Sequence, residues 1–360
     1  MKRILKYSDI VIPKIMLIFF IVIVTAAGYH GFFAKWGFLD NSQRASIEQM
    51  YDGDAHKPFV YRQLLPIVTK HIVAVLPDKA RSNLEKSKSI EEEYAVAHIS
   101  DKYHAEYVIL YTLCYLAFLI SILMMSNILS ETIGSKLAGI SAAMIFAILF
   151  PLFETRGGYF YDFFELMFFT FTVHFALRGK WLILLLTIPI ATLNKESFLF
   201  FVPLLYPFLK NNISQKNSSF IIALGIILSS SVYLWIRSQY TGNMGGTVEF
   251  HLMEHLRDLF DWHSYFKTEV NYGFKTGARM WFLYVIMVAY IIRKTWRKLP
   301  IEWLKHAKMA LVVQLPLYCL FCMPGELRNL SMLYMTFCVM LAIYIKELLV
   351  ANMEIIKLSK

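Results

Sequence analysis

Apolar stretches separated by short polar segments run through nearly the whole chain. A helix needs about 20 apolar residues to cross a bilayer, and ten stretches approach or reach that length. The expected spans lie near residues 13–33, 106–127, 137–153, 163–177, 181–193, 197–209, 219–236, 279–292, 308–323 and 330–349. Only Asn194-Lys195-Glu196 separates the fifth from the sixth, which predicts a tight hairpin or a broken helix. The pattern predicts an all-α, polytopic membrane protein with about ten transmembrane helices.

The basic residues predict the orientation. Ten spans put both termini on one side, and the chain segments on that side hold 18 of the 36 Lys and Arg but only 5 of the 26 Asp and Glu. By the positive-inside rule this side is cytoplasmic. The opposite, extracytoplasmic face then carries the segments 34–105, 154–162, 194–196, 237–278 and 324–329.

Composition agrees with a membrane protein. Hydrophobic residues make up 57% of the 360 and charged residues 17%, below the roughly 25% of a soluble domain. The net charge of +10 follows the predicted topology and forms no nucleic-acid-binding motif. All four cysteines lie inside apolar runs, which indicates buried thiols rather than a disulfide or zinc. The first apolar run resembles a signal peptide, but its apolar character continues to Phe38, which favours an uncleaved helix.

The chain is expected to form one membrane domain, residues 1–360, with two large extracytoplasmic loops, 34–105 and 237–278. In the first loop, Phe59 to Val75 has apolar residues at helical spacing and predicts an amphipathic helix in the membrane interface. The charged segment from Ala80 to Tyr103 predicts a solvated helix.

Ionisable residues gather where the extracytoplasmic loops meet the predicted spans. Such groups are costly at a membrane edge unless they are paired or solvated, so they suggest a site. Cations there suit phosphates, and carboxylates suit a general base or a metal; the alternative is structural ion pairs. The residues concerned are Asp40, Arg62, Glu154, Arg156, Asp162, Lys195, Glu196, Glu326 and Arg328.

Two further patterns have simpler explanations. Asp52 and Asp54 flank Gly53, which is typical of a turn. His251-Leu-Met-Glu254-His255 matches the H-x-x-E-H pattern of one class of zinc peptidases, but no third ligand is evident and the loop is short for a protease domain. We interpret it as an amphipathic helix on the bilayer surface.

Three features carry a resemblance to a known family. They are Asp40 in the first outer loop, the string Pro58-Phe-Val-Tyr-Arg62-Gln-Leu-Leu-Pro66, and Asn194-Lys195-Glu196 ahead of an apolar Phe-Val-Pro segment. In this layout the chain resembles the GT-C superfamily of polytopic glycosyltransferases, of the bacterial surface-polysaccharide type. It departs from that pattern because no adjacent Asp-Asp or Asp-Glu pair follows the first span; Asp40 precedes Asn41.

The resemblance implies an integral protein of the bacterial inner (plasma) membrane that moves a sugar from a polyprenyl-phosphate donor to a glycan or lipid acceptor. It implies that Asp40 is the catalytic base, with Asp54 and Asp52 as alternatives in the same loop. Arg62, Arg156, Lys195 and Arg328 would neutralise the phosphate, and Glu154, Asp162, Glu196 and Glu326 would complete the substrate site. No cofactor is certain, and a need for a divalent metal stays open. The alternatives are a polysaccharide polymerase or ligase, and a lipid or polysaccharide transporter or flippase.

Overall fold

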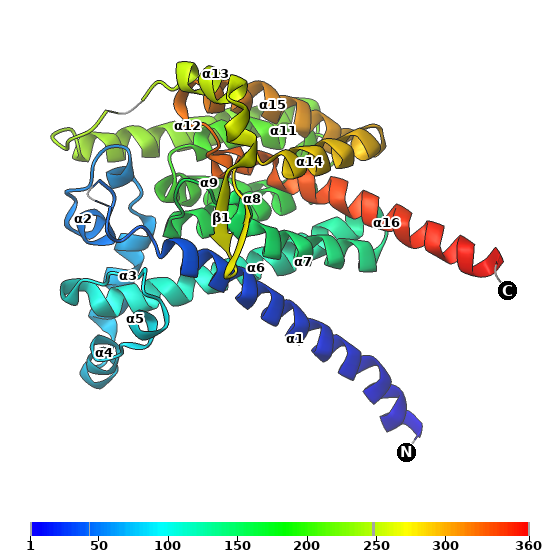
Figure 1. Ribbon diagram of the computed structural model, residues 1–360, viewed down its shortest axis with the longest axis horizontal. Helices are drawn as coiled ribbons and strands as arrows, with labels where there is room; N and C mark the ends of the chain where they lie inside the picture. Colours follow the sequence, from blue (N-terminus) through cyan, green and yellow to red (C-terminus); the bar gives the residue numbers. More distant parts are fainter. Residues whose placement is uncertain (1, 43, 247–248, 359–360) are drawn as a thin grey trace.

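The computed structural model describes residues 2–42, 44–246 and 249–358. Within these residues the chain is helical almost throughout (Figure 1). The longer helices are α1 (Lys2–Trp36), α6 (His104–Ile133), α7 (Lys136–Phe153), α8 (Phe160–Leu177), α9 (Trp181–Asn194), α12 (Gln215–Gln239), α14 (Phe282–Thr295), α15 (Ile301–Phe321) and α16 (Tyr334–Leu358).

Shorter elements fill the segments between them. The short α-helices are α2 (Ile47–Asp52), α3 (Leu64–Val75), α4 (Asp78–Glu85), α5 (Ser89–Glu93), α10 (Phe198–Phe201), α11 (Tyr206–Leu209) and α13 (Leu252–Phe260). The 3-10 helices are η1 (Phe59–Tyr61), η2 (Asp101–Tyr103), η3 (Val202–Leu205), η4 (Trp262–Phe266), η5 (Trp296–Lys298) and η6 (Leu327–Leu333). Strands β1 (Thr268–Asn271) and β2 (Phe274–Gly277) pair antiparallel as a hairpin.

The protein is a helical integral membrane protein. Six helical segments in the described part of the chain are long and apolar enough to cross a membrane: Ile15–Trp36, Asp101–Ile133, Lys136–Phe153, Phe160–Leu177, Gln215–Gln239 and Leu327–Asn352. The expected number of about ten spans is not confirmed. The other four predicted spans correspond to α9, the broken helix α10–η3–α11, α14 and α15, which are shorter or less apolar.

The arrangement of the ends is visible in the ribbon. Figure 1 shows the start of α1 and the end of α16 extending from the same end of the helix bundle. The short helices of the first loop, α2 to α5, gather at the opposite end. This arrangement agrees with an even number of crossings, because an even number returns the chain to its starting side.

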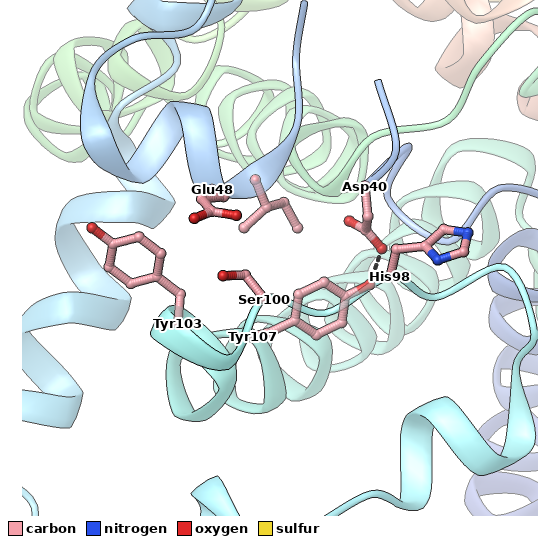
Figure 2. Close-up of a pocket in the computed structure, with 7 residues that line it drawn as sticks. Asp40, Glu48, His98, Ser100, Tyr103 and Tyr107 are labelled. Atoms are coloured by element: carbon pink, nitrogen blue, oxygen red, sulfur yellow. Dashed lines mark hydrogen bonds between the residues drawn. The ribbon is translucent and has the colours of Figure 1, made fainter. Parts of the chain in front are cut away.

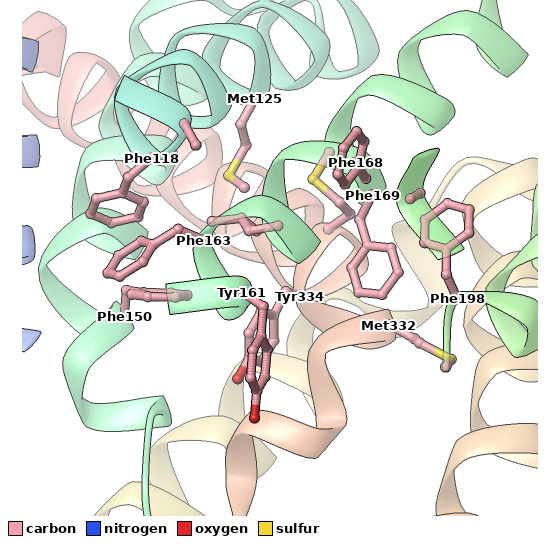
Figure 3. Packing of buried hydrophobic residues seen from close by; sticks show 14 of the residues in the cluster. Phe118, Met125, Phe150, Tyr161, Phe163, Phe168, Phe169, Phe198, Met332 and Tyr334 are labelled. Atoms are coloured by element: carbon pink, nitrogen blue, oxygen red, sulfur yellow. The ribbon is translucent and has the colours of Figure 1, made fainter. Parts of the chain in front are cut away.

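An aromatic core fixes the helices beneath the polar loops. The Phe163 ring lies 4.5 Å from that of Phe32 and 5.5 Å from that of Phe118, and Phe118 lies 4.9 Å from Phe150. Figure 3 shows Phe118 of α6, Phe150 of α7 and Phe163 of α8 packed together, with Tyr161 and Tyr334 nearby. Edge-on and tilted aromatic pairs of this kind add about 0.5–1.5 kcal/mol each beyond the area they bury. The core therefore holds the segment between α7 and α8 firmly.

The first loop differs in part from its prediction. The expected helix from Phe59 to Val75 forms as η1 and α3, interrupted at Arg62 and Gln63. The expected single helix from Ala80 to Tyr103 is wrong, because the segment divides into α4, α5 and η2. Tyr94 ends α5 in an extended conformation, and its hydroxyl pairs with His30 Nδ1 at 2.9 Å. Anchoring this ring on α1 draws the chain away from a continuous helix.

The hairpin of the second loop crosses α1. Lys35 Nζ donates to Glu269 Oε1 at 2.6 Å and to Asn271 Oδ1 at 3.0 Å. At the turn of the hairpin, Tyr272 Oη donates to the carbonyl of Ile148 in α7 at 2.7 Å. The second large loop is therefore tied to the same helices that support the first.

Candidate active site

Asp40 lies just beyond the end of α1, in a small cavity. Gly37 and Leu39 adopt left-handed conformations after the helix, with φ of 54° and 56°, and turn the chain back toward α6. The cavity has a volume of about 30 Å³, enough for a water molecule or one hydroxyl group. Its lining residues are Asp40, Ile47, Glu48, His98, Ser100, Tyr103 and Tyr107 (Figure 2).

The two oxygens of Asp40 have different surroundings. Tyr107 Oη donates to Oδ2 at 2.5 Å, whereas Oδ1 is buried and has no hydrogen-bond partner among the described residues. Figure 2 shows this second oxygen turned toward the side where Glu48 lies. Removal from water raises the pKa of Asp40 to about 7, although the bond from Tyr107 and the nearby backbone N–H groups of His98 and Phe38 oppose the shift. A carboxyl with that pKa can accept or release a proton near neutral pH.

Asp52 and Asp54, the alternative bases in the first loop, lie outside this cavity. Asp52 accepts hydrogen bonds from Lys102 Nζ at 2.6 Å and from Tyr103 Oη at 2.5 Å. Asp54 is exposed. Between them Gly53 ends α2 with a φ of 81°, so the predicted turn is confirmed.

A second cluster is a buried network of charged side chains centred on Asp162 in the first turn of α8. Lys195 Nζ lies 3.2 Å from Asp162 Oδ1, and Arg328 Nη1 lies 3.4 Å from Oδ2. Asp162 also accepts the backbone N–H of Tyr159 at 3.0 Å, which satisfies one of the free donors at the start of α8. One carboxylate therefore links three loops that are distant in the sequence.

Each cation of this network has a further carboxylate. Lys195 Nζ donates to Glu165 Oε2 at 2.7 Å, and Arg328 Nη2 donates to Glu326 Oε1 at 2.6 Å. Burial alone would lower the pKa of Lys195, but the charges of Glu165 and Asp162 outweigh it and raise the pKa. The ammonium group is consequently held in its charged form.

Arg62 extends the network to the first loop. Its Nη2 lies 3.0 Å from Glu196 Oε1, and its Nη1 donates to the Tyr161 hydroxyl. The guanidinium also lies over the Tyr161 ring, 4.2 Å from its centroid. Because Tyr161 is adjacent to Asp162, Arg62 and Glu196 form the neighbouring part of the same network.

Glu154 is a second buried carboxyl with an oxygen that lacks a hydrogen-bond partner among the described residues. Its side chain is 1% exposed, and Oε2 makes no hydrogen bond within the described residues. Burial, reinforced by the charge of Asp162, raises its pKa well above the usual value. Burial therefore disfavours the ionised form of this side chain.

Arg156 forms no ion pair with the network among the described residues. Its Nε donates to the carbonyl of Pro324 at 2.8 Å, and no carboxylate pairs with it in the part of the chain that the structure describes. The structure thus joins Arg62, Lys195 and Arg328 to Asp162 and its neighbours, while Asp40 and Arg156 lie in separate surroundings.

Sequence reasoning missed several of these residues. Glu165 follows Asp162 by three positions in an apolar helix, and that spacing places both carboxylates on one face, so this signal was present. Tyr107 and Arg279 carried no local signal, because only the folded chain brings Tyr107 to Asp40 and Arg279 to the turn at Pro324 and Gly325.

The two histidines of the second loop bond to groups of the chain itself. His251 Nδ1 pairs with Glu254 at 3.0 Å, and His255 Nε2 is 2.8 Å from the Cys322 carbonyl oxygen. Among residues 2–42, 44–246 and 249–358, no group of three or more His, Cys, Asp or Glu side chains is placed to hold a metal ion.

Compared with protein-family models, with curated proteins and with solved structures, the chain matches none of them. The class of the protein is therefore inferred from its own fold and from the distribution of its charged residues. It is a helical integral membrane protein with polar residues collected in two clusters beside its first loop.

Proposed function

We propose that the protein is a membrane glycosyltransferase that moves a sugar from a polyprenyl-phosphate donor to a glycan or lipid acceptor at the extracytoplasmic face of a bacterial inner membrane. The observation that carries the proposal is the Asp40 carboxyl, which has one oxygen held by Tyr107, the other without a partner in the described chain, and a pKa of about 7. A carboxylate in that state is suited to take a proton from a hydroxyl group.

In the proposed reaction an acceptor hydroxyl attacks the anomeric carbon of the donor sugar. The new carbon–oxygen bond forms as the bond to the phosphate oxygen breaks, and the phosphate leaves with the bonding electron pair. Asp40 Oδ1 takes the hydroxyl proton, while Tyr107 holds Oδ2. Because the cavity has room for about one hydroxyl group, we expect the acceptor ring to remain outside it.

The buried network supports this assignment by giving the neighbouring loops a fixed shape. Lys195, Arg328 and Arg62 join α8, the turn after α9, η6 and the first loop through Asp162 and Glu196. Positioning groups must be rigid to favour a transition state. A polymerase or ligase would use the same transfer step with a longer acceptor.

A lipid or polysaccharide transporter is the alternative from another class. One observation favours it, the buried and unpartnered Glu154 carboxyl beside an ion-pair network, since buried ionisable groups in membrane proteins often lie on transport pathways. A transporter would move its substrate intact, whereas the glycosyltransferase forms a new glycosidic bond.

The proposal is tested by Asp40→Asn in the full-length protein. The probes are polyprenyl-phosphate-linked hexoses and pentoses with radiolabelled sugars, supplied to membranes that contain the protein and their own glycans and lipids. Asn keeps the size of the side chain but cannot take the proton. We expect transfer to fall by at least about 100-fold while donor binding is unchanged.

Asp54→Asn is the matched control, because Asp54 is an exposed carboxylate in the same loop. It should retain transfer close to that of the unaltered protein. Near-normal turnover by a folded Asp40→Asn protein would overturn the role of Asp40. Movement of the intact labelled lipid across the bilayer, without any labelled product, would instead favour the transporter.

A further inference from the structure

Two arginines from different loops meet at one turn. Arg156 belongs to the segment between α7 and α8, and Arg279 to the segment between β2 and α14. Arg156 Nε donates to the Pro324 carbonyl at 2.8 Å. Arg279 packs on the next residue, Gly325, so closely that an added Cβ there would lie 2.8 Å from Arg279 Cδ. The turn between α15 and η6 therefore holds both side chains.

Neither arginine has a carboxylate partner within the described residues. The two carboxylates whose charges reach Arg279 are Asp258 and Glu269. Asp258 is 3.5 Å from Lys267 Nζ, and Glu269 is 2.6 Å from Lys35 Nζ. Glu154 also lies near Lys35. The four cations Lys35, Lys267, Arg156 and Arg279 thus face three carboxylates, which leaves an excess of positive charge in this region.

The arginines are also near each other. Burial lowers the pKa of Arg279, and the charge of Arg156 lowers it further. Two guanidinium groups at one turn repel each other, and an anion between them would remove that repulsion. Both are only half-buried, so an anion can reach them.

The backbone gives a second, independent observation. Arg156 and Arg279 have φ values of 59° and 57°. A left-handed conformation is unfavourable for a residue with a Cβ, and such residues cluster at ligand sites. Of the described non-glycine residues, only Leu39, Tyr272 and these two have positive φ. Leu39 precedes Asp40 and lies against Gly157, where an added Cβ would be 2.8 Å from Leu39 Cδ1. The left-handed residue beside Asp40 is therefore in contact with the residue that follows Arg156.

The buried network is unsuited to a phosphate. Its three cations, Arg62, Lys195 and Arg328, face five carboxylates: Glu154, Asp162, Glu165, Glu196 and Glu326. A phosphate placed there would add negative charge to a site that already has more carboxylates than cations. The surplus of cations lies instead at Arg156 and Arg279.

We propose that Arg156 and Arg279 together form an oxyanion site that binds a phosphate or diphosphate group. Guanidinium groups match phosphate oxygens with paired N–H donors, and two of them balance a dianion. The identity of the ligand as the donor lipid rests on the proposed function; the anion site itself does not.

The test measures binding of two probes without turnover. The full-length protein is placed in phosphatidylcholine nanodiscs and titrated with inorganic pyrophosphate, and separate nanodiscs contain added polyprenyl phosphate. We expect Arg156→Gln and Arg279→Gln each to weaken binding roughly 10- to 100-fold. Arg279→Lys keeps the charge and should lose less than Arg279→Gln. Higher ionic strength should also weaken binding.

Arg257→Gln is the matched control, because Arg257 is an exposed arginine on α13, in the same segment between α12 and α14 as Arg279. It should change binding less than twofold. If pyrophosphate binds and the arginine substitutions weaken its binding, a phosphate group is sufficient for recognition. If only polyprenyl phosphate binds in this arginine-dependent way, the ligand is a lipid headgroup. Both results support the site. Unchanged affinity for both probes in folded Arg156→Gln and Arg279→Gln proteins, or equal losses in Arg257→Gln, would overturn it. If the protein binds phosphate at these arginines but transfers no sugar, the proposed function is wrong and the anion site is still supported.

Discussion

Tyr107 donates a hydrogen bond to only one oxygen of the Asp40 carboxyl group, so the two oxygens differ in how readily they exchange a proton. With Oδ2 engaged, proton exchange is expected at Oδ1, which has no partner in the described chain. The role of Asp40 as a base requires its ionised form, and burial brings its pKa to about 7. The pH dependence of turnover therefore reports directly on this side chain.

We expect kcat/KM for glycosyl transfer to rise about tenfold per pH unit below pH 7 and to level off above it. Stability should change in the opposite direction. The pKa of Asp40 is about 7 in the folded protein against 3.8 for a free side chain, so the folded state holds more protons between these values and loses stability as pH rises through that window. Asp40→Asn should remove this loss in thermal unfolding. An activity profile that inflects near pH 4 would contradict the assignment.

At the same scale, the ion pairs of Asp162 and Asp52 differ in burial and therefore in energetic weight. Asp162→Ala leaves the buried cations Lys195 and Arg328 without their shared partner, a change expected to cost about 3–5 kcal/mol. Asp52→Ala breaks a pair whose side chains are 27% and 56% exposed, for which about 0–1 kcal/mol is expected. Thermal unfolding of both variants in detergent measures the difference. Equal losses would show that the network contributes no more than a surface pair.

At the scale of elements, the close approach of α1 and α7 depends on one glycine. A Cβ added at Gly28 would lie 2.2 Å from the Ala147 carbonyl oxygen, a backbone atom that can yield only if the helices separate. Small residues permit such close contacts between membrane helices. The contact also sets the position of the segment that follows α7, which contains Glu154 and Arg156.

We therefore expect Gly28→Ala to destabilise the protein by about 1–3 kcal/mol, the usual cost of overpacking, and to weaken glycosyl transfer by displacing the segment after α7. Gly242→Ala is the control, because nothing lies within 4 Å of a Cβ added there. Thermal unfolding and transfer assays compare the two variants. A Gly28→Ala protein as stable as Gly242→Ala would mean that α1 and α7 are free to move apart.

At the scale of the whole molecule, the distribution of charge predicts which parts of the chain face each side of the membrane. Ser87 lies in the first loop, and Ser214 immediately precedes α12. In a background without Cys114, Cys319, Cys322 and Cys338, Ser87→Cys should react with an impermeant thiol reagent on intact cells, and Ser214→Cys should react only after the cells are opened. Labelling of both from the outside would reject the predicted orientation.

The class of the protein and the location of most of its helices follow from the sequence alone. A membrane helix satisfies its own backbone hydrogen bonds and needs a long apolar stretch. Both requirements concern one continuous segment of the chain, so the sequence of that segment is enough to recognise them. Four of the expected spans are shorter or less apolar than the other six. For helices such as α9 and α15, crossing the membrane depends on more than the length and hydropathy of the segment.

The tertiary structure alone decided which charged side chains became partners. The sequence gathered Asp162, Lys195 and Arg328 at helix ends, but only helix packing joined them in one network and left Arg156 outside it. In the same way, α6 brings Tyr107 to Asp40 across 67 positions, and the turn at Pro324 and Gly325 brings Arg279 to Arg156. The physical reason is range: apolar length is a local property of the chain, whereas a hydrogen bond or ion pair requires two groups within about 3–4 Å, which depends on how distant helices pack.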